Sequence, residues 1–166
     1  MDRVAAKILK ALMGVENEQP LRPVPRTEHP NAAEYWTRAI LMERGAYLGK
    51  LAKYGEGSAS ETIKEFPQHC AMLSFRSRDG DAEVHENFAD IFYVLEGSAT
   101  LVSGGAVTGA RQISPGEMSG TSIIGGIRYP LGAGDVAHVP AGQPHQMLVS
   151  GEKGVTCLVV KVRETP

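Results

Sequence analysis

The 166-residue chain has few cysteines, few aromatic residues and no excess of either charge. Cys70 and Cys157 are too few for a disulfide framework and too far apart for a thiolate metal site. The 17 basic and 19 acidic residues give a formal net charge of -2, which argues against a nucleic-acid-binding surface. No run approaches the ~18 apolar residues that a membrane span needs. We therefore expect a soluble, cytoplasmic protein that binds neither nucleic acid nor a membrane.

Glycine and proline are plentiful, with 19 and 10 residues. Such a turn-rich composition fits many short strands better than a helix bundle. From about Glu61 the chain consists of short apolar or alternating runs bounded by Gly, Pro or Asp. The predicted strands are 62–66, 68–75, 82–85, 90–95, 98–102, 122–124, 126–129, 135–139, 145–149 and 155–162. This spacing predicts an antiparallel sandwich or barrel, with residues 106–120 as its longest turn-like, mobile loop.

The N-terminal part has a different pattern. Residues 1–13 predict an amphipathic helix, and the prolines of residues 15–30 indicate an extended arm. Asn31 is expected to cap a helix that continues through Met42, and residues 46–54 to form another short helix. The predicted division is 1–58 for the helices and Pro-rich arm, packing on the barrel or on a partner subunit, and 59–166 for the barrel.

Acidic and imidazole side chains gather in two short segments. Glu83 and His85 stand two residues apart in a predicted strand, so their side chains share one face. Asp90 follows after a gap long enough for a turn and can return a carboxylate from the neighbouring strand. Further along, the prolines and glycine of residues 140–144 fix the loop before His145 and hold its imidazole in a defined position.

The segment that ends in His145 resembles the second motif of the cupin superfamily, which reads Gly-x5-Pro-x-Gly-x2-His-x3-Asn. Four positions match at the family's spacing, namely Gly134, Pro140, Gly142 and His145. Val149 stands where the family has its final Asn. The loop before the imidazole is thus the part of this motif that the chain keeps.

The earlier segment resembles the first cupin motif, Gly-x5-His-x-His-x(3,4)-Glu-x6-Gly. The matching positions are His85 for the second His, Asp90 for the Glu and Gly97 for the last Gly. The departures are Glu83 in place of the first His and Ser77 in place of the first Gly. An acidic residue thus stands where the family offers a further imidazole.

The resemblance covers about residues 60–163 and implies an all-β fold. This is the double-stranded β-helix or jelly-roll barrel, commonly a dimer, with a metal inside its open end. Here it would carry an N-terminal helical and extended arm, which in a homodimer can reach across to the other subunit. The metal ligands that the resemblance implies are Glu83, His85, Asp90 and His145, with Asn87 replacing Glu83 if the strand register slips. Two imidazoles and two carboxylates suit Mn, Fe(II), Zn or Ni and suit Cu(I) poorly.

Three functions remain open at this point. The first is a metal-dependent enzyme that acts on a small organic molecule by isomerase, lyase or dioxygenase chemistry, with Glu83 as general base if it is not a ligand. The second is a non-catalytic binder or sensor, with the same side chains hydrogen-bonded in a metal-free cluster, and the third is a structural dimeric barrel. The cost of burying two carboxylates without a compensating cation favours the metal. Expected substrate contacts are Phe92, Tyr129, Gln143 and Met147.

Overall fold

The computed structural model describes residues 33–164. The predicted helix of residues 1–13 and the Pro-rich arm of residues 15–30 lie outside this range and stay predictions. The predicted helix start after Asn31 is wrong, because residues 33–37 are not helical and the helix begins only at Arg38. One compact unit begins at Thr37 and contains the helix and strands described below. The predicted domain boundary and the homodimer also stay predictions. The described part of the chain holds no helix long and apolar enough to cross a bilayer.

Helix α2 (Arg38–Ala52) is one helix where the sequence predicts two. It begins after Thr37, whose side-chain oxygen accepts a hydrogen bond from the backbone N–H of Ile40 at 3.2 Å. The predicted break near Gly45 is wrong, because the missing side chain serves packing there instead of ending the helix. A Cβ at this position would lie 2.7 Å from Cγ2 of Thr156. Gly45 therefore lets the helix approach Thr156 closely.

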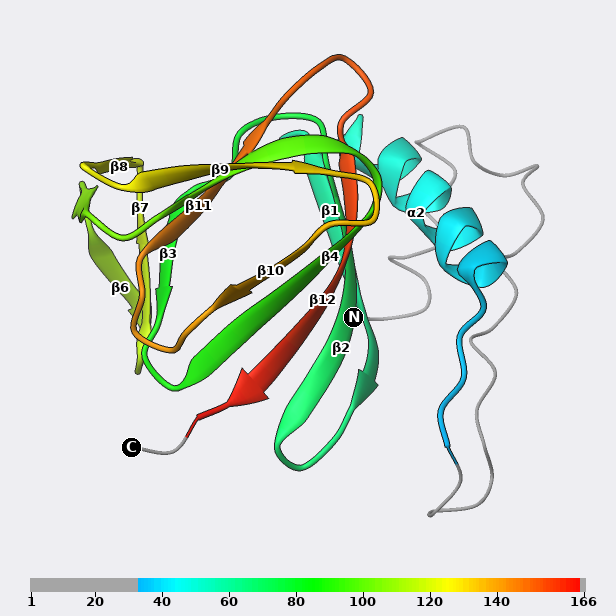
Figure 1. The fold of residues 1–166 in the computed structure, drawn as a ribbon, viewed down its shortest axis with the longest axis horizontal. Helices are drawn as coiled ribbons and strands as arrows, with labels where there is room; N and C mark the ends of the chain where they lie inside the picture. Colours follow the sequence, from blue (N-terminus) through cyan, green and yellow to red (C-terminus); the bar gives the residue numbers. More distant parts are fainter. Residues whose placement is uncertain (1–32, 165–166) are drawn as a thin grey trace. The chain divides into compact units, whose positions relative to one another are not determined.

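Twelve strands follow the helix (Figure 1). Their bounds are β1 (Ser58–Glu65), β2 (His69–Arg76), β3 (Ala82–His85), β4 (Phe88–Ser103), β5 (Ala106–Thr108), β6 (Arg111–Ser114), β7 (Glu117–Gly120), β8 (Ser122–Ile124), β9 (Ile127–Gly132), β10 (Val136–Val139), β11 (His145–Val149) and β12 (Val155–Arg163). Ten of them form one antiparallel sheet, and β5 and β8 form a separate two-stranded sheet. The sequence thus predicts most strands of the barrel, including those that carry the candidate ligands.

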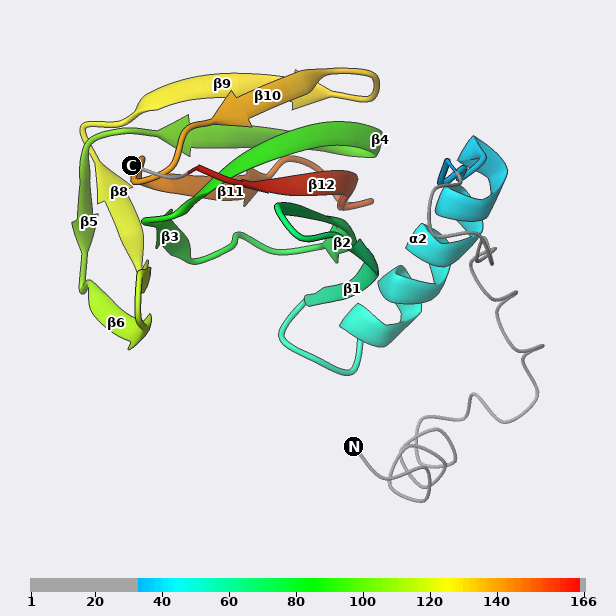
Figure 2. The ribbon, with the colours of Figure 1, turned by 90° about the horizontal axis from the view of Figure 1, so that it is seen from below.

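The sheet curls around β4, the long strand that belongs to both of its halves. The first part of β4 pairs with β12 and β10, and its second part pairs with β11 and β9. Figure 2 shows β9 and β10 along one side of β4, and β11 and β12 along the other. We call β1-β2-β12-β4-β10 the β2 half and β6-β7-β3-β11-β4-β9 the β3 half.

Gly97 lies where β4 passes from one half to the other, and no other residue type fits there. Its φ is +83°, a left-handed conformation that L side chains rarely adopt. A Cβ on Gly97 would also lie only 2.0 Å from the carbonyl oxygen of Gly154. The bend of β4 therefore depends on a residue without a side chain.

The hydrophobic core lies between the two halves. Its buried members are Val94, Ala99, Leu101, Leu131, Val139, Met147, Val155, Cys157 and Val159. They come from both halves, and we call the faces that carry them the inner faces. Because side chains alternate along a strand, the residues two positions from these core residues also point inward.

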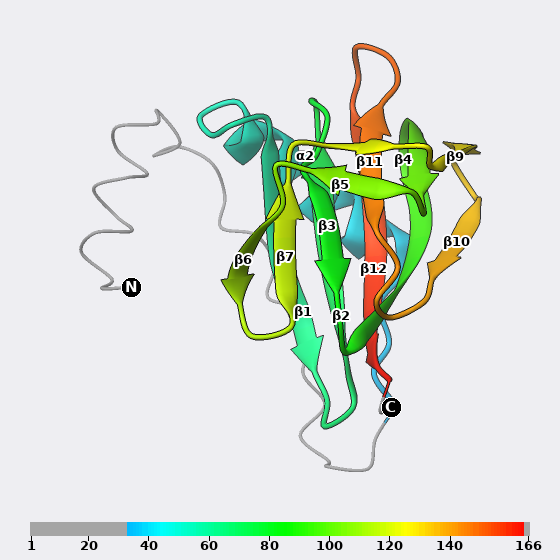
Figure 3. The same ribbon diagram turned by 90° about the vertical axis from the view of Figure 1, so that its left-hand side faces the viewer.

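Residues 106–120 are not the mobile loop that the sequence predicts. They contain β5, β6 and β7, and β7 pairs with β3 along its whole length. Figure 3 shows β6, β7 and β3 side by side. The prediction failed because these strands are three or four residues long and β6 is exposed throughout, so no apolar period marks them. The segment therefore extends the β3 half by two strands.

Candidate functional site

Three strands bring the predicted ligands together on the inner faces. His145, at the start of β11, lies directly opposite Glu83 of β3, and His85 follows two positions later on the same face. Asp90 enters from β4 of the other half, where it lies opposite Lys161 of β12. Glu83, His85 and His145 therefore form one group that could hold a metal ion, and Asp90 faces both imidazoles from the other half, whereas Asn87 is not part of the group.

The donor atoms of this group point to a common centre. Nε2 of His85 and Nε2 of His145 each lie 3.4 Å from Oδ2 of Asp90. The same two nitrogens lie 3.8 and 4.0 Å from Oε2 of Glu83. Ligand atoms that are each about 2.1 Å from one ion stand roughly 3 to 4 Å apart. The spacing of the donor atoms of Glu83, His85 and His145 therefore matches that of atoms sharing a divalent metal ion, with Asp90 beside both imidazoles.

Both imidazoles are held in the tautomer that a metal requires. Nδ1–H of His145 donates to the backbone carbonyl of Gln143 at 3.2 Å, and Nδ1–H of His85 donates to the carboxylate of Glu117. With the proton on Nδ1, each Nε2 carries a lone pair. Both Nε2 atoms are buried and have no hydrogen-bond partner within residues 33–164. Two buried acceptors without donors, aimed at one point, fit a metal ion.

Glu117 is a residue of this site that the sequence did not reveal. It lies on β7, directly opposite His85, in the segment predicted to be a loop. A carboxylate that accepts from Nδ1–H orients the imidazole and makes its other nitrogen more basic. No local motif marks Glu117, since only the pairing of β7 with β3 brings it to His85.

Lys161 is the second residue that the sequence analysis missed. Its Nζ donates to both carboxylate oxygens of Asp90, at 2.8 and 2.9 Å. Asp90 is only 2% exposed, so this ammonium compensates a charge that water does not reach. The sequence did contain one signal for this residue, because Lys161 is a charged side chain at an inner-face position of an otherwise apolar strand. Arg76 lies further out, with Nη2 3.9 Å from Oε1 of Glu83.

These contacts shift the pKa of two members in opposite directions. Burial alone would raise the pKa of Asp90, but the imidazoles of His145 and His85 that face it and the ammonium of Lys161 outweigh burial and hold the pKa far below its usual range. Burial alone would lower the pKa of His85, but the carboxylates of Asp90 and Glu117 beside it outweigh burial and raise the pKa above its ordinary value. Without a metal the site therefore keeps Asp90 ionised and lets His85 take a proton.

The predicted substrate contacts occupy three different places. Phe92 lies beside the ligand group, with its ring centroid 6.0 Å from that of His145 and its edge toward it. Tyr129 and Gln143 line a cavity of about 500 Å³. Met147 is buried in the core and is not among the residues that line this cavity.

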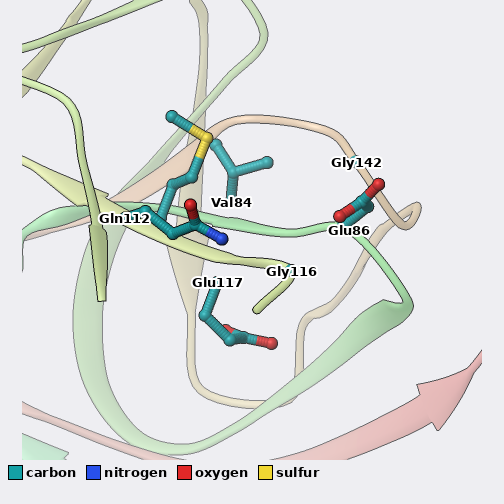
Figure 4. Close-up of a pocket in the computed structure, with 7 residues that line it drawn as sticks. Val84, Glu86, Gln112, Gly116, Glu117 and Gly142 are labelled. Atoms are coloured by element: carbon teal, nitrogen blue, oxygen red, sulfur yellow. The ribbon is translucent and has the colours of Figure 1, made fainter. Parts of the chain in front are cut away.

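A second pocket, of about 420 Å³, lies against β3, β6 and β7 (Figure 4). In the close-up the side chains of Val84 and Glu117 extend to opposite sides of their strands. This follows from the alternation along β3 and β7, in which His85 and Glu117 take the inner face and Val84 takes the outer one. Val84, Gln112 and Met118 line the pocket from the outer face, so we call it the outer-face pocket, and Glu117 also lines it.

The comparison with protein families assigns the chain. The model of the family described as "Cupin domain" matches residues 77–161, which is just over half of the chain and includes all four predicted ligands. The chain belongs to the cupin domain family. A search of curated proteins gives no match for this cupin.

Solved structures resemble the cupin's fold at low sequence identity. A Klebsiella pneumoniae protein with a double-stranded beta-helix domain shares 19% identity over 66% of this chain and 79% of its own, with a TM-score of 0.50. TT1209 from Thermus thermophilus shares 19% over 67% and 88%, with a TM-score of 0.49. A predicted oxalate decarboxylase from Thermotoga maritima shares 15% over 64% and 81%, also at 0.49. At such identities the likeness shows the fold alone.

The fold prediction is confirmed, since the cupin is an all-β, double-stranded β-helix protein. Its described residues also contain a group that can hold a metal ion, formed by Glu83, His85 and His145. Glu83, in place of a family histidine, therefore belongs to the group and makes it two imidazoles and a carboxylate.

Proposed function

We propose that this cupin is a metal-dependent enzyme that acts on a small organic molecule by isomerase, lyase or dioxygenase chemistry. One observation carries the proposal. The Nε2 atoms of His85 and His145 are both buried, both without a hydrogen-bond partner among the described residues, and both aimed at the same two carboxylates. Two such acceptors are costly to bury unless a cation binds them.

The residues that would hold the metal are Glu83, His85 and His145, with Asp90 as the fourth donor. Two imidazoles and oxygen ligands suit Mn, Fe(II), Zn or Ni. A bound divalent ion supplies Lewis acidity toward a substrate oxygen, provided that a coordination position stays open. Lys161 shares the charge of Asp90, which keeps a second carboxylate tolerable in this buried place.

Glu83 is the member of the group best placed to exchange a proton with a substrate. Its side chain is 37% exposed, whereas those of His145 and Asp90 are 5% and 3% exposed. A base must reach the proton that it takes, and Glu83 alone combines this access with a place beside both imidazoles. We assign it the role of general base when the ion leaves one of its oxygens free.

Metal analysis tests the proposal. The protein is purified without chelator from cells supplied with Mn, Fe, Zn or Ni, and its metal content is measured by mass spectrometry. We expect close to one ion per chain, reduced at least about ten-fold in the His85→Ala variant. The matched control is His138→Ala, an exposed imidazole on β10. Wild type without near-stoichiometric metal under all four conditions contradicts the proposal.

A metal-free, non-catalytic binder is the second candidate, and the Lys161–Asp90 pair favours it. Lys161 already compensates the most buried carboxylate, so the cluster keeps a cation without any metal. A binder would show saturable ligand affinity and no product. An enzyme would lose turnover, and keep ligand binding, in the Glu83→Gln variant.

A further inference from the structure

The cavity of about 500 Å³ opens on the inner face of β4, between β9 and β10. The residues that line it are Leu101, Ser103, Tyr129, Leu131, Val136, Ala137, His138, Pro140 and Gln143. Its volume lies in the range of small-molecule sites, which is roughly 300 to 1,000 Å³. It is lined by a different set of residues from the outer-face pocket shown in Figure 4.

Ser103 connects this cavity to the ligand group. It lies opposite His145 on the neighbouring strand, and His145 lies opposite Glu83 on the next one, so the three side chains form one row across β4, β11 and β3. Directly opposite residues of antiparallel strands have Cβ atoms about 5 Å apart. Gln143 also belongs to both places, since its side chain lines the cavity and its carbonyl accepts from Nδ1–H of His145. A molecule in the cavity therefore lies one residue away from a proposed metal ligand.

The polar side chains of the cavity are hydrogen-bonding groups without a permanent charge, and they include the exposed imidazole of His138 on β10. Ser103 and Tyr129 offer hydroxyls, and Gln143 offers an amide that can both donate and accept. The amide lies over Gly104, where an added Cβ would come within 3.1 Å of its Nε2. Apolar side chains lie next to these polar groups on the same face: Leu101 is opposite Tyr129 on the neighbouring strand, and Leu131 is two positions from Tyr129 along β9.

Among the described residues that line the cavity there is no Asp, Glu, Lys or Arg. The two cations nearest to the ligand group are engaged elsewhere, Lys161 by both oxygens of Asp90 and Arg76 beside Glu83. A phosphate or carboxylate in the cavity would lose hydration without an ionic partner, and an ammonium group would do the same. Walls without a permanent charge, with the imidazole of His138 exposed on β10, therefore favour an uncharged molecule.

We propose that the cavity binds an uncharged molecule that carries both hydroxyl or carbonyl oxygens and an apolar portion. This substrate class rests on the proposed function, because it places the oxygen-bearing side toward the metal group. Ser103 and Gln143 orient the oxygens, Tyr129 contacts the molecule at the exposed edge strand, and Leu101 and Leu131 contact its apolar portion.

Three probes of similar size and different charge test this assignment. They are 2-hydroxyacetophenone, which is neutral, mandelate, which is an anion, and 2-amino-1-phenylethanol, which is a cation. Each is titrated by calorimetry into the full-length, Zn-loaded protein and into the chelator-treated protein. We expect 2-hydroxyacetophenone to bind at least about ten-fold more tightly than either charged probe, a difference of about 1.4 kcal/mol.

Variants locate the binding. Ser103→Ala and Gln143→Ala should each weaken 2-hydroxyacetophenone about five-fold or more without lowering Zn content. Gln112→Ala, in the outer-face pocket, should leave it unchanged. Thermal unfolding of every variant shows that it is folded.

Three outcomes overturn the proposed substrate class. They are equal or tighter binding of mandelate or of the amine, no binding of any probe, and binding that does not change when Ser103 or Gln143 is replaced. Absence of Zn binding instead overturns the proposed function, and the chelator-treated titrations still test the cavity.

Discussion

Lys161 and Asp90 form a two-point ion pair inside the barrel, with Nζ 2.8 and 2.9 Å from the two carboxylate oxygens. One of these oxygens, Oδ2, also faces Nε2 of His85 and Nε2 of His145 at 3.4 Å. A single carboxylate thus stands between a permanent cation and the proposed metal position. The behaviour of the site with and without metal follows from this shared contact.

Replacing Lys161 with Met should have opposite effects on the metal-free and metal-loaded protein. Without metal, Asp90 loses its compensating charge, and we expect a loss of about 2 to 4 kcal/mol in the free energy of unfolding. The range is below that of a fully enclosed pair because the Lys161 side chain is 23% exposed. With metal, Asp90 is free to give its full charge to the ion, so Zn affinity should rise. Urea unfolding with and without Zn measures both effects, with Lys161→Arg as the control. Equal stability of the Met variant and wild type without metal contradicts this prediction.

Replacing Glu117 with Gln should weaken metal binding without unfolding the barrel. The amide no longer attracts the proton of His85 Nδ1 as a carboxylate does, so Nε2 becomes a poorer ligand. Loss of such an outer contact typically lowers metal affinity about 10- to 100-fold. Competition with a chromophoric chelator measures the affinity. Glu86→Gln is the matched control, since it removes the same charge from the neighbouring turn. A Glu117→Gln variant that binds Zn as tightly as the control would show that the contact is only structural.

The stability of the metal-free protein should fall as pH rises from about 6 to above the folded-state pKa of His85. The pKa of His85 is raised above its ordinary 6.5, so its protonated form stabilises the folded state at low pH, and this contribution disappears once the folded form loses the proton. Asp90 does not contribute in this window, because its lowered pKa confines its own loss of stability to acid solution.

Urea unfolding at several pH values measures this effect in wild type and in His85→Asn, and the difference between them isolates His85. The metal-loaded protein should show the reverse trend. A proton and the ion compete for Nε2 of His85, so metal affinity should increase with pH and level off above the same pKa. A stability difference between wild type and His85→Asn that is constant with pH would contradict the assigned direction.

Replacing Gly97 with Ala should destabilise the fold by about 3 kcal/mol or more. The variant meets both the strain of a left-handed backbone and a Cβ only 2.0 Å from the carbonyl oxygen of Gly154. Gly134→Ala separates the two causes, because Gly134 has φ +95° with nothing within 4 Å of the added Cβ. Backbone strain alone should cost about 1 to 2 kcal/mol there. Chemical denaturation compares the two variants, and equal losses would exclude the contact with Gly154.

The residues predicted from the sequence are those that short-range patterns identify. Glu83 and His85 share a face because they are two apart in a strand, and a rigid Pro-Gly loop places His145, so local rules bring both segments to the site. The strands around them also have clear apolar or alternating periods. This is why the barrel and its four convergent side chains were visible before the structure.

The residues that were missed depend on strand pairing. Glu117 reaches His85 only because β7 pairs with β3, and Lys161 reaches Asp90 only because β12 lies beside β4. Neither pairing follows from the sequence near those residues. Ser103 was missed for the same reason, since only the register of β4 and β11 places it directly opposite His145. The single helix in place of two reflects packing of Gly45 on Thr156, a contact between distant parts of the chain.

The hairpin of β6 and β7 serves the proposed metal site and not the hydrophobic core. The segment between β4 and β9 closes no part of the core, yet it supplies the carboxylate that sets the proton position on His85. A change in the length or sequence of this segment would therefore alter the affinity for the ion without changing the strands that carry Glu83, His85, Asp90 and His145. Metal affinity can thus be tuned through a segment that contributes no residue to the hydrophobic core.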